Sequence, residues 1–467
     1  MYVGFQDDWG FRWSRGRSAL LDEAAGAGAT VIRTTVYWSK VAKTRPKHPA
    51  DPFDPAYCLY DLDELVRGAE RRGMHVLLTI WGTPAWANGG AGENRMPRHV
   101  SDLRDFAHAL AARYSGQFAG FPYVRFYSIW NEPNLSQFLA PQFSPDGQSL
   151  APALYASLFR AAAAGIRSAN PAALVAAGET AHRGLDGPAR PGFQASHSPA
   201  RFAELLSQVR PRIVFDAWAH HPYPIEPSRA PAGQGAWPDV SMPQIEQFRS
   251  SLAGWFDRPD LPLWITEFGY QTTPGAEVGV TPADQARYLA WAFQAARADP
   301  HVQMFLWFVF RDRPDMSWKG GLEGVDGRRK VGFTSFAEAA RGVDMRNPVA
   351  FVRTETPYPL VSVPVTRLGW YDADGANIAV RYRIVRAGRT IARGNVAVPL
   401  GRDGSVQFRP AFWPAPGSTY RMHVRAEDAH GNVVRSRVTF VPLGEGGPPA
   451  WAPRPCLLGD SIASHCP

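Results

Sequence analysis

Short apolar segments alternate with longer amphipathic segments over about the first 340 residues, and this order constrains the fold more than any other feature. Each apolar segment has the length of a buried strand, and a segment with helical spacing follows it. Eight such units favour a closed (β/α)8 TIM barrel over an open doubly wound sheet. The predicted strands are Tyr2–Phe5, Val31–Val36, Val76–Ile80, Val124–Ile129, Leu174–Ala177, Ile213–Trp218, Leu263–Thr266 and Met304–Val309.

Helix signals at the segment ends agree with this order. Gly73 and the pair Asn170-Pro171 are stop signals directly before predicted strands, and Thr281-Pro282 is a start signal. The predicted helices are Arg17–Ala27, Leu62–Arg72, Leu103–Phe118, Leu154–Ala169, Arg201–Val209, Met242–Phe256, Pro282–Ala298 and Phe333–Arg341.

The pattern changes near Pro348 to a period of two residues, with Asp-Gly turns at Asp374 and Asp403. This predicts a small antiparallel β-sandwich domain of about six or seven strands after the barrel. We therefore expect a barrel over residues 1–347, a β-sandwich over 348–443 and a Pro/Gly-rich tail over 444–467.

The composition, 45% hydrophobic and 20% charged, is that of a folded globular protein. The net charge is +8, but the basic residues are scattered, so we expect no nucleic-acid partner. A basic surface would suit an acidic polysaccharide. No apolar run approaches the roughly 20 residues of a membrane-spanning helix, so no membrane span is expected. The oligomeric state stays open.

Three cysteines are too few for a disulfide framework, and none has the spacing of a metal-ligand pair. Cys58 is expected to be a lone thiol, whereas Cys456 and Cys466 could close a small loop, which would imply an oxidising compartment. The start, MYVGFQDDWG, lacks the pattern of a signal peptide. We expect a secreted or cell-surface protein whose leader is absent from this chain, and a cytoplasmic location stays open.

Two glutamates stand where predicted strands end. Glu132 lies in residues 129–133 (IWNEP) and Glu267 in residues 265–269 (ITEFG). The carboxyl ends of barrel strands form the active-site face, so both side chains should meet there. Glycoside cleavage needs two carboxyl groups, because one protonates the departing oxygen while the other attacks the anomeric carbon or activates water. The pair therefore predicts a glycosidase, although either glutamate alone could simply pair with a barrel arginine.

These two segments resemble the signature strands of the clan A glycoside hydrolases. The resemblance covers the barrel and implies retention of anomeric configuration, with Glu132 as the acid/base and Glu267 as the nucleophile. No cofactor is implied. Within the clan, residues 3–5 (VGF) and the sixth strand most resemble family thirty-nine and its cellulase-like bacterial relatives.

Further positions match the clan one at a time. Arg33 resembles the arginine that supports the nucleophile, and its charge would keep Glu267 ionised. Asn131 matches the residue that binds the sugar 2-hydroxyl. His221 and Tyr223 resemble the clan histidine and tyrosine, and a tyrosine there can donate to the nucleophile.

The adjacent pair His220 and His221 leaves two questions open. The sequence does not decide which of the two faces the site. A metal site is not expected, because no third ligand stands at convincing spacing.

Sixteen tryptophans are many for this length, and flat aromatic rings suit the apolar faces of sugars. Trp307, at the end of the eighth strand, resembles the clan tryptophan that floors the first sugar subsite. Trp81 and Trp38 follow the third and second strands and would line the cleft. For any one of them a core position is equally plausible.

Two alternatives remain. A transglycosylase would share every catalytic residue. A catalytically silent carbohydrate-binding surface protein would have no reason to keep several buried charges together. The sugar, the linkage, the choice between internal and terminal attack, and the role of the β-sandwich stay open.

Overall fold

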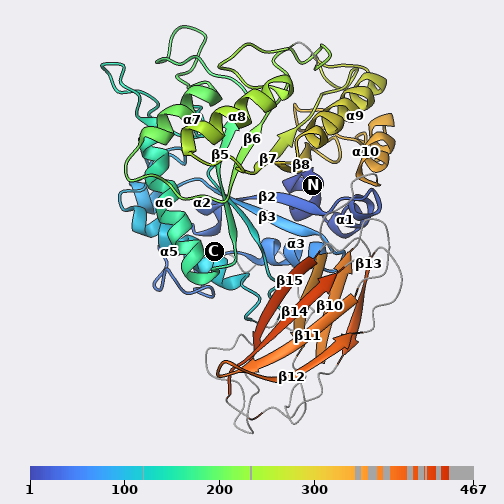
Figure 1. The fold of residues 1–467 in the computed structure, drawn as a ribbon. Helices are drawn as coiled ribbons and strands as arrows, with labels where there is room; N and C mark the ends of the chain where they lie inside the picture. The colour runs from blue at the N-terminus through green and yellow to red at the C-terminus, as the bar shows by residue number, and fades with distance from the viewer. Residues whose placement is uncertain are drawn as a thin grey trace.

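A computed structural model describes residues 1–118, 120–231, 234–341, 349–355, 365–371, 379–396, 403–408, 415, 418–427 and 433–440. Eight parallel strands close into a barrel, which confirms the predicted (β/α)8 fold (Figure 1). The strands are β1 (Tyr2–Gln6), β2 (Val31–Tyr37), β3 (His75–Trp81), β4 (Phe126–Ile129), β5 (Leu174–Ala181), β6 (Ala217–His221), β7 (Leu263–Phe268) and β8 (Val302–Phe308).

Helices surround the barrel and match the predicted ones to within a few residues. The long ones are α1 (Arg17–Gly26), α3 (Tyr60–Glu70), α5 (Val100–Arg113), α6 (Ala151–Ala169), α7 (Pro199–Gln208), α8 (Ile245–Phe256), α9 (Pro282–Ala298) and α10 (Val331–Arg341). Single turns lie at η1 (Trp9–Trp13), α2 (Trp38–Val41), α4 (Ala85–Asn88) and η2 (Met242–Gln244).

The sixth strand begins at Ala217, four residues later than predicted. The carboxylate of Asp216 accepts the backbone N–H of Val175 at 2.8 Å and pairs with Arg167 at 2.9 Å. These contacts hold the segment before Ala217 at the entrance of the barrel, so pairing with the neighbouring strand starts only beyond it.

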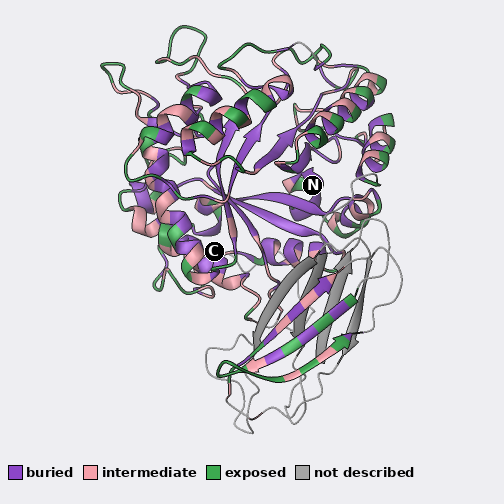
Figure 2. Ribbon diagram, viewed as in Figure 1, coloured by how far each residue is buried: buried purple, intermediate pink, exposed green. Residues whose placement is uncertain are grey.

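Alternating strand residues form two apolar layers, which Figure 2 shows as continuous burial through the barrel. Outward side chains such as Ile32 and Phe305 pack against the helices. Inward side chains fill the barrel, so the residues above them on the same strands form the floor of a site at the mouth. The inward set is Val31, Leu77, Phe126, Ala176, Ala217, Ala219, Trp264, Met304 and Leu306.

Two irregularities in register change which side chains point inward. Gly178 pairs with Ala219 and Thr180 with His220, so Glu179 is an extra residue on β5 and has φ +49. The register between β7 and β8 shifts in the same way across residues 265–268. A bulge re-aims a side chain, and both shifts turn a glutamate toward the barrel axis where strict alternation would place it outside.

The C-terminal part forms two antiparallel sheets, of order β13-β10-β9 and β12-β11-β14-β15. Strand β9 contacts β15 and β14, as expected of a small sandwich. The predicted domain boundaries stay predictions. The strands are β9 (Val349–Glu355), β10 (Val365–Tyr371), β11 (Ala379–Arg386), β12 (Arg389–Val396), β13 (Asp403–Phe408), β14 (Tyr420–Glu427) and β15 (Val433–Phe440).

The predicted tail over 444–467, with Cys456 and Cys466, lies outside the described residues. Cys58 is disulfide-bonded, so the expectation of a lone thiol is wrong. Within the described part of the chain, none of the helices combines the length and the apolar character that crossing a membrane requires.

Candidate active site

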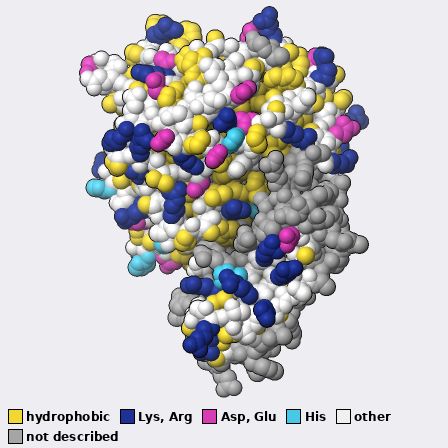
Figure 3. All heavy atoms as spheres, in the orientation of Figure 1, with side chains coloured by type: hydrophobic (Ala, Val, Ile, Leu, Met, Phe, Trp, Pro, Cys, Tyr) yellow, Lys and Arg dark blue, Asp and Glu magenta, His cyan; other side chains and the backbone are white. Residues whose placement is uncertain are grey.

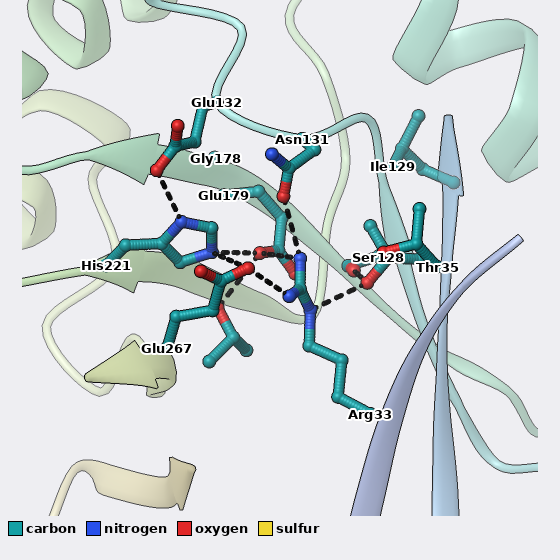
Figure 4. Close-up of polar contacts among 12 residues, drawn as sticks. Arg33, Thr35, Ser128, Ile129, Asn131, Glu132, Gly178, Glu179, His221 and Glu267 are labelled. Carbon is teal, nitrogen blue, oxygen red and sulfur yellow. Dashed lines mark hydrogen bonds and ion pairs between the residues drawn. The ribbon is translucent and has the colours of Figure 1, made fainter. Parts of the chain in front are cut away.

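Arg33 on β2 is the centre of a polar network at the mouth of the barrel (Figure 4). Its side chain is fully buried, and Nη1 donates to Glu267. Nη2 donates to Asn131 Oδ1 at 2.9 Å and to Glu179 Oε2 at 3.0 Å. Nε donates to Thr79 Oγ1 at 2.9 Å. Each nitrogen of the guanidinium has an acceptor, which is the condition for burying such a charge.

Glu267 accepts hydrogen bonds on both carboxylate oxygens. Oε1 receives Nη1 of Arg33, and Oε2 receives the hydroxyl of Tyr223 at 3.0 Å. Burial raises the pKa of Tyr223 well above its ordinary value, and the charge of Glu267 adds to this. The phenol therefore keeps its proton and donates it, so two donors orient this carboxylate.

His221 bridges the other carboxyl groups. Nδ1 lies 2.9 Å from Glu132 Oε1, and Nε2 lies 2.7 Å from Glu179 Oε2. Burial alone would lower the pKa of His221, but the negative charge of Glu267 and the bonds to the other two glutamates raise it to about 10. The ring is therefore an imidazolium at neutral pH and donates from both nitrogens.

The structure also answers which histidine of the pair faces the site. His220 points to the outer layer, where Nδ1 contacts Thr180 Oγ1 at 2.8 Å and Nε2 contacts the carbonyl of Val240 at 2.9 Å. Burial lowers the pKa of His220 to about 3, so that ring is neutral. His221 faces the barrel axis because Ala219 and Ala217, two and four residues earlier, do so.

Glu132 follows β4 on a strained backbone. Trp130 and Glu132 have φ values of +69 and +40, a region that costs free energy for non-glycine residues and is typical of functional sites. The N–H of Glu132 donates to the carbonyl of Glu179 at 2.8 Å, which ties this turn to the β5 bulge. Burial raises the pKa of Glu132; His221 opposes this and Glu267 reinforces it. Glu132 thus tends to keep its proton.

Glu179 is a site residue that sequence reasoning missed. It is fully buried, and Thr266 Oγ1 donates to its Oε2 at 2.9 Å. Burial would raise the pKa of Glu179, yet Arg33 and His221 outweigh it and hold the pKa at about 2. Its carboxylate is therefore a fixed negative charge. An acidic residue near the end of the fifth strand was the available signal, but alternation would have pointed it outward.

Two of the three predicted tryptophans lie elsewhere. Trp307 is fully buried on the outer face of β8, where Nε1 donates to the carbonyl of Gly320 at 2.9 Å. The inward positions of β8 belong to Met304 and Leu306, so the residue beyond them that faces inward is Phe308. Placing Trp307 in the cleft was therefore wrong.

Trp38 is also fully buried, and its ring stacks on Phe106 at 5.7 Å with an interplanar angle of 17°. It packs in the layer between barrel and helices, so its predicted place in the cleft was wrong too. Trp81 ends β3 and is only partly buried. Its ring meets Tyr37 at 5.7 Å, and Nε1 donates to the carbonyl of Phe138 at 3.2 Å, so Trp81 lies at the rim of the mouth.

Two aromatic residues that were not predicted flank Tyr223. The ring of Trp318 lies 5.4 Å from that of Tyr223 at 76°, and the ring of Phe308 lies 6.2 Å away at 89°. Trp318 Nε1 donates to the carbonyl of Phe308 at 3.1 Å, which fixes the loop after β8 over the site. A tryptophan in the loop after the last strand was the signal that could have found it.

The network is built from paired charges. Across the residues that the structure describes, no group of three or more His, Cys, Asp or Glu side chains is arranged to bind a metal. The site instead combines two cations, Arg33 and His221, with the carboxyl groups of Glu132, Glu179 and Glu267.

Comparison with known proteins identifies the family. Residues 3–310 match the model of the cellulases of glycosyl hydrolase family 5. The chain belongs to glycosyl hydrolase family 5. This agrees with the clan A resemblance, whereas the finer likeness to family thirty-nine stays a prediction. No curated protein matches the family 5 chain.

Solved structures with TM-scores above 0.5 share the fold of this family 5 member. A GH5_18 enzyme from Streptomyces cattleya in complex with GlcNAc is 18% identical, with a TM-score of 0.54 over 73% of this chain and 79% of that one. A substituted form of it with Manβ1-4GlcNAc has a TM-score of 0.51 at 18% identity, over 73% and 80%. Xylanase 10B from Thermotoga maritima is 16% identical, with a TM-score of 0.47 over 73% and 94%.

Proposed function

We propose that this family 5 protein is a retaining glycoside hydrolase that cleaves O-glycosidic bonds of a polysaccharide or oligosaccharide through a covalent glycosyl-enzyme. Glu267 is the nucleophile, and Glu132 is the acid/base. The observation that carries the proposal is the contrast between the two glutamates. Glu267 accepts bonds from Arg33 and Tyr223, whereas burial raises the pKa of Glu132.

Charge balance explains why the two glutamates differ. Arg33 and His221 supply two positive charges, and Glu179 supplies one permanent negative charge. One further negative charge neutralises the buried network. The bonds from Arg33 and Tyr223 place that charge on Glu267, so Glu132 is protonated in the resting enzyme.

The first step uses this distribution. A carboxylate oxygen of Glu267 attacks the anomeric carbon, while Glu132 gives its proton to the departing glycosidic oxygen. The bond from carbon to the leaving group breaks, and an ester between the sugar and Glu267 forms. Glu267 then has no charge, so the network favours the ionised form of Glu132.

The second step reverses the roles. The carboxylate of Glu132 takes a proton from water, and the water oxygen attacks the anomeric carbon. The ester bond breaks, Glu267 recovers its charge and Glu132 is protonated again. Two inversions at one carbon give net retention. Retention predicts carboxyl groups of Glu132 and Glu267 about 5–5.5 Å apart.

Asn131 and the rim aromatics would hold the sugar. Arg33 occupies the Oδ1 of Asn131, which leaves the amide nitrogen to donate to a sugar hydroxyl such as the 2-hydroxyl. Trp81, Phe308 and Trp318 offer apolar ring faces to the C–H groups of a pyranose. The sugar itself is to be identified by a screen of aryl glycosides followed by polysaccharides.

Azide rescue tests the two roles. With the aryl glycoside found in the screen, Glu267→Ala should lose hydrolysis and recover with azide, giving a glycosyl azide of inverted configuration, because the anion enters where the carboxylate stood. Glu132→Ala should lose least activity on very acidic leaving groups, and azide should give the retained product. Products of the opposite stereochemistry, or near-wild-type rates in both variants, would contradict the assignment.

A further inference from the structure

One face of the sheet β12-β11-β14-β15 is rich in arginine. Arg381 and Arg383 on β11 and Arg393 on β12 are exposed, while Arg425 and His423 on β14 are partly exposed. Figure 3 shows Arg side chains gathered beside a histidine on the described part of this sheet. We call these five residues the arginine face.

The strand register brings these charges directly opposite one another. Arg383 pairs with Arg393 on one side and with His423 on the other, and Arg381 pairs with Arg425. Like charges at opposed positions destabilise an antiparallel pair. The arginine face therefore does not serve the stability of the sheet.

The opposite face of the same strands supplies the core. Val380, Tyr382 and Ile384 alternate with the arginines of β11 and are buried, as is Val424 on β14. These residues already account for the folding of the strands, because one apolar face is enough for an antiparallel sheet. Neutral polar residues would suit the exposed positions of these strands equally well. Folding of the sheet therefore does not explain why arginine recurs there.

The arginine face also lines a hollow of about 620 Å³. Within the described residues, Arg425 has a carboxylate partner, Glu427, and no ion pair is formed by Arg381, Arg383 or Arg393. Guanidinium groups bind carboxylate and sulfate groups through paired hydrogen bonds. The hollow therefore suits an anionic ligand.

We propose that the arginine face binds an anionic polysaccharide, whose carboxylate or sulfate groups pair with Arg381, Arg383 and Arg393. The barrel on the same chain belongs to a family that acts on carbohydrates, which favours a polysaccharide over other polyanions. Binding there needs no catalytic residue, and it goes beyond the proposed reaction. It would hold a polymer to the enzyme and raise its local concentration.

The test measures affinity of the full chain for four polymers: polygalacturonate, dextran sulfate, neutral dextran and duplex DNA. A Glu267→Gln background keeps the polymers intact. The binding variant carries Arg381→Gln, Arg383→Gln and Arg393→Gln. A control variant loses three other exposed arginines, with Arg104→Gln, Arg212→Gln and Arg328→Gln, and so has the same net charge.

We expect the binding variant to bind the anionic polysaccharides about tenfold more weakly, because it loses three exposed charge pairs with the polymer. The affinity of the control variant should change less than about twofold. Comparing polygalacturonate with dextran sulfate distinguishes carboxylate from sulfate recognition. Unchanged melting temperatures show that both variants fold. Binding of the wild type should weaken as salt is added. Equal affinities in all variants, equal binding of neutral dextran, or tighter binding of DNA would overturn the proposal.

Discussion

Replacing Glu179 by Gln removes one charge from the buried network without changing the size of the side chain. The pKa of Glu179 falls from the ordinary 4.5 to about 2, a difference worth about 3 kcal/mol of folding free energy. The raised pKa of His221 comes in part from the same interaction with Glu179. The free energies inferred from the two pKa shifts are therefore not added. We expect Glu179→Gln to lose about 3 kcal/mol near neutral pH.

Calorimetry measures this loss of stability as a lower melting temperature for the unfolding of the barrel. With an unfolding entropy of about 2.1 cal/mol/K per residue over about 340 residues, 3 kcal/mol lowers the melting temperature by about 4 °C. Glu204→Gln is the matched control, because the Glu204 side chain is 36% exposed and pairs with Arg201 at the surface. That pair should be worth less than about 1 kcal/mol.

The pH dependence gives the sharper test. A carboxyl group with a lowered pKa stabilises the fold above its ordinary pKa, and the contribution is lost as pH falls toward the lowered value. The difference between wild type and Glu179→Gln should therefore be full at pH 6 and shrink between pH 4.5 and 2. A difference that is absent at pH 6, or equally large at pH 3, would refute the charge network.

Three further predictions concern the site and the second domain. Tyr223→Phe removes the 3.0 Å bond to Glu267 and should lower kcat by about ten- to a hundredfold with little change in melting temperature; an unchanged kcat would contradict its role. Trp81→Ala should raise KM, whereas Trp38→Ala should destabilise the fold by about 3–5 kcal/mol in thermal unfolding, and the reverse pattern would contradict their positions. Under reducing conditions, in which neither chain keeps the Cys58 disulfide, a chain ending after Asn347 should stay as soluble as the full chain and cleave aryl glycosides at the same rate, and aggregation of the shorter chain alone would mean that the sandwich covers an apolar barrel surface.

The barrel could be predicted because its signals are local. Each strand is an apolar run, and helix caps mark the ends of the intervening segments. The helix Pro282–Ala298 was predicted with its observed bounds, since Thr281 Oγ1 accepts the N–H of Asp284 at 3.1 Å as the sequence indicates. The strand that was misplaced, β6, depends on contacts of Asp216 with a distant strand, which no local pattern reveals.

Site residues that stand in a motif were predicted from the sequence. Site residues whose side-chain direction depends on an irregular backbone were missed. Glu132 and Glu267 stand in recognisable sequence motifs. They could therefore be assigned to the site without deciding from strand alternation whether their side chains point inward or outward. Glu179 faces the site because of a bulge, and alternation assigned it to the outside. The prediction for Trp307 failed although β8 alternates regularly. Met304 and Leu306 point inward, so Trp307 points outward and is fully buried, and Phe308 takes the next inward position.

Trapping the covalent intermediate tests the central claim, that Glu267 attacks the anomeric carbon. A 2-deoxy-2-fluoro glycoside with an activated leaving group, made from the sugar that the screen identifies, should inactivate the enzyme. Mass spectrometry of a proteolytic digest should then find one fluorosugar on the peptide that contains Glu267, and the Glu267→Gln variant should not be labelled. A label on the peptide with Glu132 or Glu179, or inverted product without any label, would contradict the account.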